Sequence, residues 1–202
     1  AWGGHPAKGG KPYVLKSLEK AGVAPEEVQM VLYTHLHNDH AGACDLFPNA
    51  MNVFQKDEYA NLLNPLPSQQ IRKDYDMSLI PVLAKANNCM VDGDVRLNNG
   101  IEIYKTAGHT SGSMSILVHT TSGPRIMLGD FSHLPCMMFP QMKTMTMMDG
   151  KVENITPAPP ANGPVLIGAL VSDHYAYYDS HYQPNSLVPK YTPAYFLAGT
   201  DP

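Results

Sequence analysis

A short segment of the sequence, THLHNDH at residues 34–40, holds three histidines and an aspartate. Imidazole nitrogen and carboxylate oxygen are ligands that zinc and its first-row neighbours prefer, and the three cysteines form no C-x-x-C pair of the kind that structural zinc sites use. At the end of an extended strand, alternate residues point to one side, so His35 and His37 can bind one metal ion, while a following turn presents Asp39 and His40 to a second. Two such ions can activate a water molecule between them and polarise the carbonyl or phosphoryl group that it attacks.

Two later motifs supply further candidate ligands. The segment AGHTSG, residues 107–112, places His109 on a glycine-flanked turn after an expected strand, where the backbone is free to bend. The segment LGD, residues 128–130, ends a later expected strand with Asp130, whose carboxylate is suited to bridging two cations. A single Gly-His or Gly-Asp pair commonly marks a turn, so the prediction of a metal site depends on all three motifs together.

The elements expected around these motifs are strands and helices of ordinary length. A compact apolar run at residues 28–33 predicts a buried strand that leads directly into the first motif. Apolar residues at helical spacing predict a helix over residues 13–21 and another over residues 56–63, within a mostly helical stretch that reaches residue 86. The remaining expected elements are strands at residues 51–54, 90–91, 101–104, 115–119, 125–128 and 195–197, a long surface loop at 135–164 and a helix at 175–183.

Length and composition fit a single domain, residues 1–202, because 44% of the residues are hydrophobic and can form one core. A net charge of -4 gives no general attraction for nucleic acid or for anionic membranes, so small-molecule partners are expected. No apolar stretch approaches the roughly 18 residues of a membrane span, and the N-terminus lacks the pattern of a signal peptide. Together with the few, scattered cysteines, these features predict a cytoplasmic protein.

The three motifs resemble metal motifs of the metallo-β-lactamase superfamily, and within it the sequence is most similar to the N-acyl homoserine lactonase family. Supporting matches are the strand and motif at residues 28–42, QKDEY at 55–59, VDGD at 91–94, YDS at 178–180 and the tail at 195–202. The resemblance extends from about Pro12 onward and is weak between residues 135 and 175. It implies an α/β (α+β) architecture, namely an αββα sandwich of two mixed sheets covered by helices, with the site at one sheet edge.

The resemblance also implies a dinuclear metal site. It assigns one metal ion to His35, His37 and His109, the other to Asp39 and His40, and the bridging position to Asp130. Two zinc ions per chain are expected, with manganese, cobalt or iron as alternatives. A hydroxide that bridges the metals would attack a lactone carbonyl, and Asp39 is also counted among the catalytic residues.

The sequence departs from the family in three respects. Thr200 stands where the family has a histidine that completes the second metal site, so weaker binding of the second metal is expected, unless His174 or His181 substitutes; both also fit ordinary surface histidines. His133 stands where the family has a tyrosine, and is either a catalytic proton donor or a surface residue. The strands that open the family's fold have no counterpart before Pro12, which predicts a fragment or a partner chain, such as a second copy in a homodimer.

The leading hypothesis is a metal-dependent hydrolase that opens a lactone ring, such as that of an N-acyl homoserine lactone. The same hydroxide chemistry would serve a thioesterase or a phosphotriesterase, because fold does not fix substrate. A degenerate, non-catalytic metal-binding homologue is the third alternative, favoured by Thr200 and the missing strands. The methionine-rich stretch at residues 137–148, with Leu62, Leu63 and Leu66, could line a groove for an acyl chain, and packing on the core explains these residues equally well.

Overall fold

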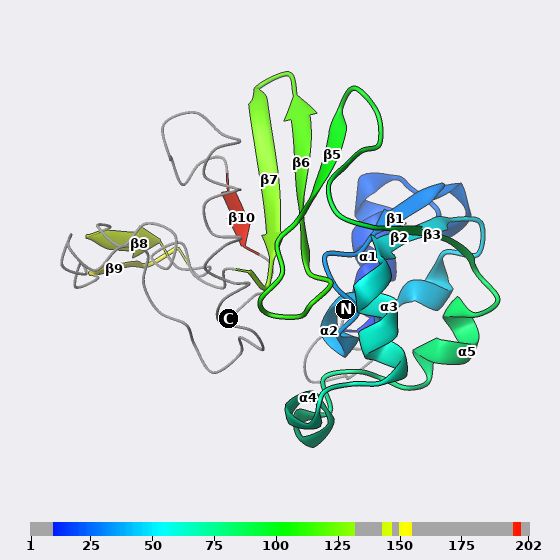
Figure 1. The fold of residues 1–202 in the computed structure, drawn as a ribbon. Coiled ribbons are helices and arrows are strands. Elements are labelled where there is room, and N and C mark those ends of the chain that lie inside the picture. Colours follow the sequence, from blue (N-terminus) through cyan, green and yellow to red (C-terminus); the bar gives the residue numbers. More distant parts are fainter. Residues whose placement is uncertain (1–9, 132–142, 147–149, 155–195, 199–202) are drawn as a thin grey trace.

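In the computed structural model (Figure 1), the described residues are 10–131, 143–146, 150–154 and 196–198. The helices are α1 (Lys11–Ala21), α2 (Asn38–Ala41), α3 (Lys56–Leu63), α4 (Pro67–Arg72) and α5 (Leu79–Leu83), with 3-10 turns η2 (Pro25–Glu27) and η3 (Cys44–Leu46). The strands are β1 (Met30–Leu32), β2 (Met51–Gln55), β3 (Asn87–Val91), β4 (Val95–Arg96), β5 (Ile101–Lys105), β6 (Met114–Thr120), β7 (Gly123–Gly129), β8 (Thr144–Thr146), β9 (Val152–Asn154) and β10 (Phe196–Ala198).

Two sheets carry the described part of the fold. The first is parallel, in the order β1-β2-β3, because helical segments cross over between its strands. The second is mixed, in the order β10-β7-β6-β5-β4, with β10 parallel to β7 and the other pairs antiparallel (Figure 1). A tight turn joins β6 to β7, since Thr120 lies opposite Gly123. The loops after β1, β5 and β7 are those that carry the three motifs.

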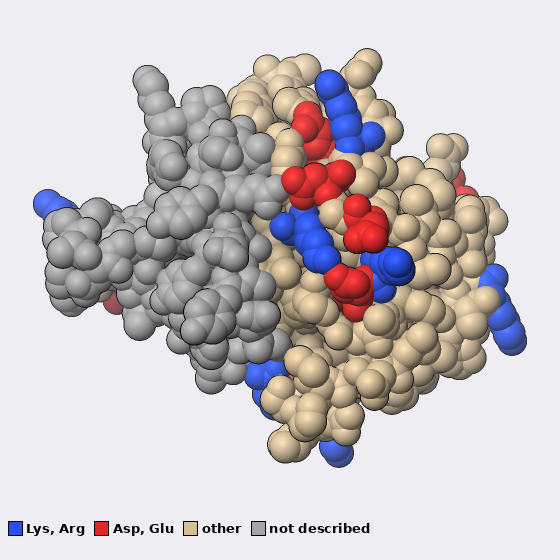
Figure 2. Space-filling model, viewed as in Figure 1, with Lys and Arg blue, Asp and Glu red and all other residues tan. Residues whose placement is uncertain are grey.

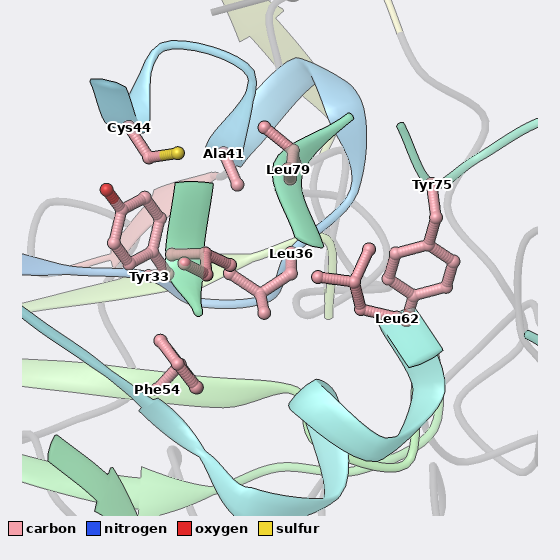
Figure 3. Packing of buried hydrophobic residues seen from close by; sticks show 9 residues of the cluster. Tyr33, Leu36, Ala41, Cys44, Phe54, Leu62, Tyr75 and Leu79 are labelled. Carbon is pink, nitrogen blue, oxygen red and sulfur yellow. The ribbon is translucent and has the colours of Figure 1, made fainter. Parts of the chain in front are cut away.

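Neighbouring residues of β2 show how the layers stack. Phe54 belongs to a core cluster with Leu62 of α3, which Figure 3 shows in close-up. Val53 belongs instead to a second cluster that contains Ile103 of β5. Because successive side chains of a strand point to opposite faces, helices cover one face of the parallel sheet and the mixed sheet covers the other. This arrangement supplies the helix, sheet and sheet layers of the predicted αββα sandwich; the helix expected at residues 175–183 lies outside the described residues.

The helices predicted at residues 13–21 and 56–63 are confirmed as α1 and α3. The strand predicted at residues 28–33 exists as β1, which is an edge strand among the described residues. The prediction that it is buried is wrong for β1 itself, because Met30 is exposed and Val31 and Leu32 are only partly buried against the two cores. The surface loop predicted at residues 135–164 contains the hairpin of β8 and β9, next to a glycine turn at Gly150 with φ of 83°. None of the helices that the structure describes is long and apolar enough to cross a membrane.

Acidic and basic side chains gather on one face, in the region where α3 and β5 lie (Figure 2). Lys105 of β5 pairs with Asp57 of α3, and the Lys56 ammonium of α3 lies 4.0 Å from the Asp92 carboxylate in the turn after β3. Exposed pairs of this kind contribute about 0–1 kcal/mol each. These two ion pairs connect α3 to β5 and to the turn after β3. α3 also carries Glu58, which is buried next to the candidate site.

Candidate metal centre

The first motif leaves β1 in an extended conformation and then turns into α2. Backbone pairing with β2 continues as far as Tyr33. His37, with φ of -60° and ψ of 157°, is the last extended residue before α2. The single helical turn of α2 begins at Asn38, so Asp39 and His40 lie in its first turn. The strand end followed by a turn is therefore the local geometry that the spacing of the motif predicted.

Three buried imidazoles form a first cluster of candidate ligands. His35, His37 and His109 are 1%, 4% and 2% exposed, and their ring centroids lie 4.6 to 4.8 Å apart. Each offers a ring nitrogen within 4.8 Å of those of the other two. The loop after β5 of the mixed sheet thus places His109 next to His35 and His37, which follow β1 of the parallel sheet. These three histidines are the group that the family resemblance implies for one metal ion.

A second cluster shares one histidine with the first. Asp39 and His40 group with His35, with ligand atoms again within 4.8 Å. Asp130 lies beside both clusters, because its carboxylate oxygens are 3.1 Å from His40 Nε2, 3.4 Å from His109 Nε2 and 3.9 Å from His35 Nε2. This position suits a carboxylate that bridges two cations. The sharing of His35 is a difference from the predicted assignment, in which it served one metal only.

The buried nitrogen atoms of the first cluster fit a metal ion. His35 Nε2 and His37 Nε2 are buried without a hydrogen-bond partner among the described residues. Burial, followed by the neighbouring histidines, holds the pKa of His35 well below its ordinary value, and burial together with His109 lowers the pKa of His37 to about 3. Both rings are therefore neutral near pH 7, with lone pairs available, and a cation would satisfy nitrogen atoms that are otherwise costly to bury.

The second cluster has the opposite electrostatic character. Burial lowers the pKa of His40, but the nearby carboxylates of Asp130 and Asp39, whose oxygens lie 3.1 and 3.4 Å from its Nε2, outweigh burial and raise this pKa to about 9. Burial opposes ionisation of Asp39, whereas its hydrogen bond with His40 favours ionisation, and the pKa of Asp39 falls below its ordinary value. Without a metal, a proton on His40 thus balances the two carboxylates; a divalent cation would supply the same compensation.

Close backbone packing brings the third motif to the first. β7 ends at Gly129, whose φ of 59° is left-handed, and a Cβ at this position would lie 2.6 Å from Thr34 Cβ. Thr34 directly precedes the first histidine, so the absence of a side chain at Gly129 lets the loop with Asp130 approach it. β10 pairs with β7 so that Ala198 lies opposite Gly129, which puts the strand just before the tail residue Thr200 at this end of the sheet.

The sequence of residues 3–141 matches the family described as the metallo-beta-lactamase superfamily. The chain belongs to this superfamily. With its two packed sheets and outer helices, it has the metallo-β-lactamase fold, so the fold class and the family predicted from the motifs are confirmed.

The curated relatives of this chain include N-acyl homoserine lactonases. An N-acyl homoserine lactonase of a Bacillus species is 31% identical over 121 residues, which are 59% of this chain and 45% of that protein. The N-acyl homoserine lactonase AttM of Azorhizobium caulinodans is 32% identical over 126 residues, 59% of this chain and 47% of that protein. The chain thus spans less than half of the length of these relatives.

Solved structures of the same fold include lactone hydrolases. An N-acyl homoserine lactone hydrolase with the product N-hexanoyl-L-homoserine bound at its catalytic metal centre has a TM-score of 0.65 and 22% identity, over 93% of this chain and 62% of that one. A quorum-quenching N-acyl homoserine lactone lactonase has a TM-score of 0.66 and 21% identity, over 95% of this chain and 66% of that one. At 21–22% identity, the similarity to these structures shows that this chain has the same fold and nothing more.

Of the other site residues predicted from the sequence, some lie outside the described residues and some within them. His133, His174, His181 and Thr200 lie outside the described residues, as does most of the methionine-rich stretch at 137–148. Among the three leucines proposed for an acyl groove, Leu62 is fully buried in the core, which favours the packing alternative for it, whereas Leu63 and Leu66 are 50% and 46% exposed.

Glu58 and Tyr75 are buried beside the site and were not predicted from the sequence. A glutamate in the first turn of a helix usually faces solvent, and Tyr75 belongs to no motif. Only the match of QKDEY to the lactonase family pointed to this helix start. Burial raises the pKa of Glu58, and hydrogen bonds from Thr110, Leu36, Tyr75 and Gly112 act against this rise.

Proposed function

We propose that this chain is the catalytic part of a metal-dependent hydrolase that opens the lactone ring of N-acyl homoserine lactones. The observation that carries the proposal is the convergence of four histidines and two aspartates from three separate loops on one buried site. The names of its relatives support lactones as the substrate class.

The proposed metal complement is two zinc ions per chain, with manganese, cobalt or iron as alternatives. The residues that would hold them are His35, His37 and His109 for one ion and Asp39 and His40 for the other, with Asp130 shared. When bound, such ions polarise an ester carbonyl and lower the pKa of water. Because Thr200 replaces the family's histidine, we propose that the second ion binds more weakly than the first.

The protein residues have distinct proposed tasks in the reaction. The neutral imidazoles of His35 and His37 exclude water from the inner side of the site, because both are buried. Asp39 is the most exposed of the six candidate ligands, with 17% of its side chain exposed against 13% for His40, and it is ionised, so we assign it the additional task of accepting a proton and passing it on during ring opening. His133 is proposed to donate a proton to the departing ring oxygen.

The test combines metal analysis with a substrate panel. Metal content per chain is measured by elemental analysis, and hydrolysis of an N-acyl homoserine lactone, a thioester and a phosphotriester is followed for wild type and for His37→Ala. The matched control is His119→Ala, which removes an exposed histidine that pairs with Glu102 far from the site.

Bound metal, together with lactone turnover that only His37→Ala abolishes, supports the proposal. Two ions per chain would support the dinuclear complement and would mean that the second site keeps its ion despite Thr200, whereas one ion would support the weakened second site. Faster turnover of the thioester or phosphotriester than of the lactone would replace the substrate assignment. Metal binding without any turnover would favour the degenerate homologue.

A further inference from the structure

We infer that Glu58 positions the two ligand-bearing loops, residues 34–40 and 107–112, relative to each other. This inference rests on the proposed function, because it treats the histidines of the two loops as metal ligands. Glu58 lies on α3, is 0% exposed and belongs to neither cluster of candidate ligands. Its carboxylate is hydrogen-bonded to both loops at once, as the contacts of each oxygen show.

One oxygen of Glu58 holds the first loop. The Leu36 backbone N–H donates to Oε1 at 2.9 Å, and the Tyr75 hydroxyl donates to the same oxygen at 2.7 Å. Leu36 lies between His35 and His37, so this bond fixes the backbone from which both imidazoles project. The Tyr75 ring also packs edge-on against the His37 ring, with centroids 4.6 Å apart. Glu58 therefore determines the path of the loop and, through Tyr75, the orientation of one ligand.

The second loop is bound to the same helix. The Thr110 hydroxyl, directly after the histidine of this loop, donates to Glu58 Oε2 at 2.5 Å. A Cβ at Gly112 would lie 2.3 Å from the Glu58 backbone nitrogen, so the loop is in direct contact with the helix. One turn later, the Asn61 side chain donates to the hydroxyl of Ser111 at 2.7 Å.

The chemistry of the side chain explains why a carboxylate is needed. An isolated buried carboxylate is strongly unfavourable, but three donors from three segments of the chain satisfy this one. Glutamine has the same shape with a single acceptor oxygen, so Glu58→Gln loses the negative charge and can keep a bond to Thr110 only by donating to that hydroxyl, which then has to reorient. Residues that orient metal ligands in this way typically affect metal affinity by about 10- to 100-fold.

The test compares Glu58→Gln with Gln55→Ala. Gln55 is a matched control because it is 1% exposed, lies three residues earlier, and makes two side-chain bonds to Gly93 in a turn without candidate ligands. Metal-free protein is titrated with Co²⁺ against a competing chelator, and the Kd and the visible absorption spectrum of bound cobalt are recorded. The Tm of each metal-free variant measures the purely structural loss.

We expect Glu58→Gln to weaken cobalt binding by about 10- to 100-fold and to shift the cobalt spectrum. Gln55→Ala should lower the Tm and leave the Kd and the spectrum unchanged. A folded Glu58→Gln protein with wild-type Kd and spectrum would overturn the inference. Equal weakening of cobalt binding by both variants would also overturn it, because the effect would then follow stability alone.

Amide hydrogen exchange of the metal-free proteins separates this inference from the proposed function. Wild-type protein that binds no cobalt would contradict the proposed function only. In that case, faster exchange at Leu36 or Gly112 in Glu58→Gln, relative to the Met51 amide that donates to the Gln29 carbonyl outside both loops, supports the positioning role. Unchanged exchange at both amides overturns it.

Discussion

The loops that follow the two sheets contribute to the site in different ways. After the parallel sheet, one segment at residues 34–40 carries four of the candidate ligands, and its shape follows from a strand end and one helical turn. After strands of the mixed sheet, two separate loops carry His109 and Asp130, one each. Their positions depend on Gly112 against Glu58 and Gly129 against Thr34. Ligand chemistry is thus concentrated in one region, while the accuracy of the site depends on how the other region is held against it.

The largest effect on metal binding is expected from removing His109, the candidate ligand on the loop after β5. His109→Ala should abolish measurable metal binding, because it removes one of three imidazoles of the first cluster. The loss of affinity should exceed the roughly 100-fold loss that is typical of changes to residues that only orient the ligands. Isothermal titration with Zn²⁺ measures the loss, and His119→Ala is the control at an exposed histidine. Binding by His109→Ala with wild-type affinity would mean that the mixed sheet is dispensable for the first ion.

The second comparison tests the two cores. Leu36→Ala and Ile103→Ala each remove a fully buried side chain, and each should lower the free energy of unfolding by about 2–5 kcal/mol in urea denaturation. Leu36 belongs to the core cluster of Phe54, Leu62 and Tyr75 that Figure 3 shows. The two residues that flank it in the sequence are candidate ligands, so Leu36→Ala should also weaken zinc binding.

Ile103→Ala is the matched control and should leave zinc binding unchanged in the folded protein. If a variant does not fold, Leu36→Val and Ile103→Val provide the same contrast with a smaller cavity. Equal zinc affinities for the two variants would contradict a link between the first core and the ligands.

Much of the segment at residues 34–40 could be predicted from sequence, because its shape depends on local backbone geometry. The alternation of His35 and His37 and the helical turn with Asp39 require only strand and helix geometry over a few residues. α1 and α3 were predictable for the same reason, because their apolar spacing and ends are local.

Long-range contacts were not predictable from periodicity. The burial of Glu58 depends on donors at Leu36, Tyr75 and Thr110, which are separated from it by 22, 17 and 52 residues. β1 was wrongly expected to be buried, because an apolar composition does not show which strands pair on both sides, and among the described residues β1 pairs only with β2. β4 was missed because two residues carry no period, and its existence follows from pairing with β5.

Gly129→Ala tests the close approach of the third motif to the first. The left-handed φ costs an alanine about 1–2 kcal/mol, and the clash with Thr34 adds to it, so we expect a loss of about 2–3 kcal/mol in the free energy of unfolding. Gly22→Ala is the matched control: its φ is 70°, a Cβ there would have no atom within 4 Å, and we expect a loss of about 1 kcal/mol. If Gly129→Ala and Gly22→Ala lose the same free energy of unfolding, Thr34 can move away from the added methyl group without cost.

The smallest effect is expected at a thiol in the core next to the first motif. Burial, together with the charge of Asp45, raises the pKa of Cys44 to about 11, and its side chain packs in the same core as Leu36. Because only the thiolate reacts, iodoacetamide at pH 8 should modify Cys44 far more slowly than the partly buried Cys89, as peptide mass mapping would measure. The two rates should become similar in denaturant. Equal rates in the native protein would mean that the core next to the first motif opens readily, and that this core does not hold the four candidate ligands of residues 34–40 more firmly than the surface elsewhere.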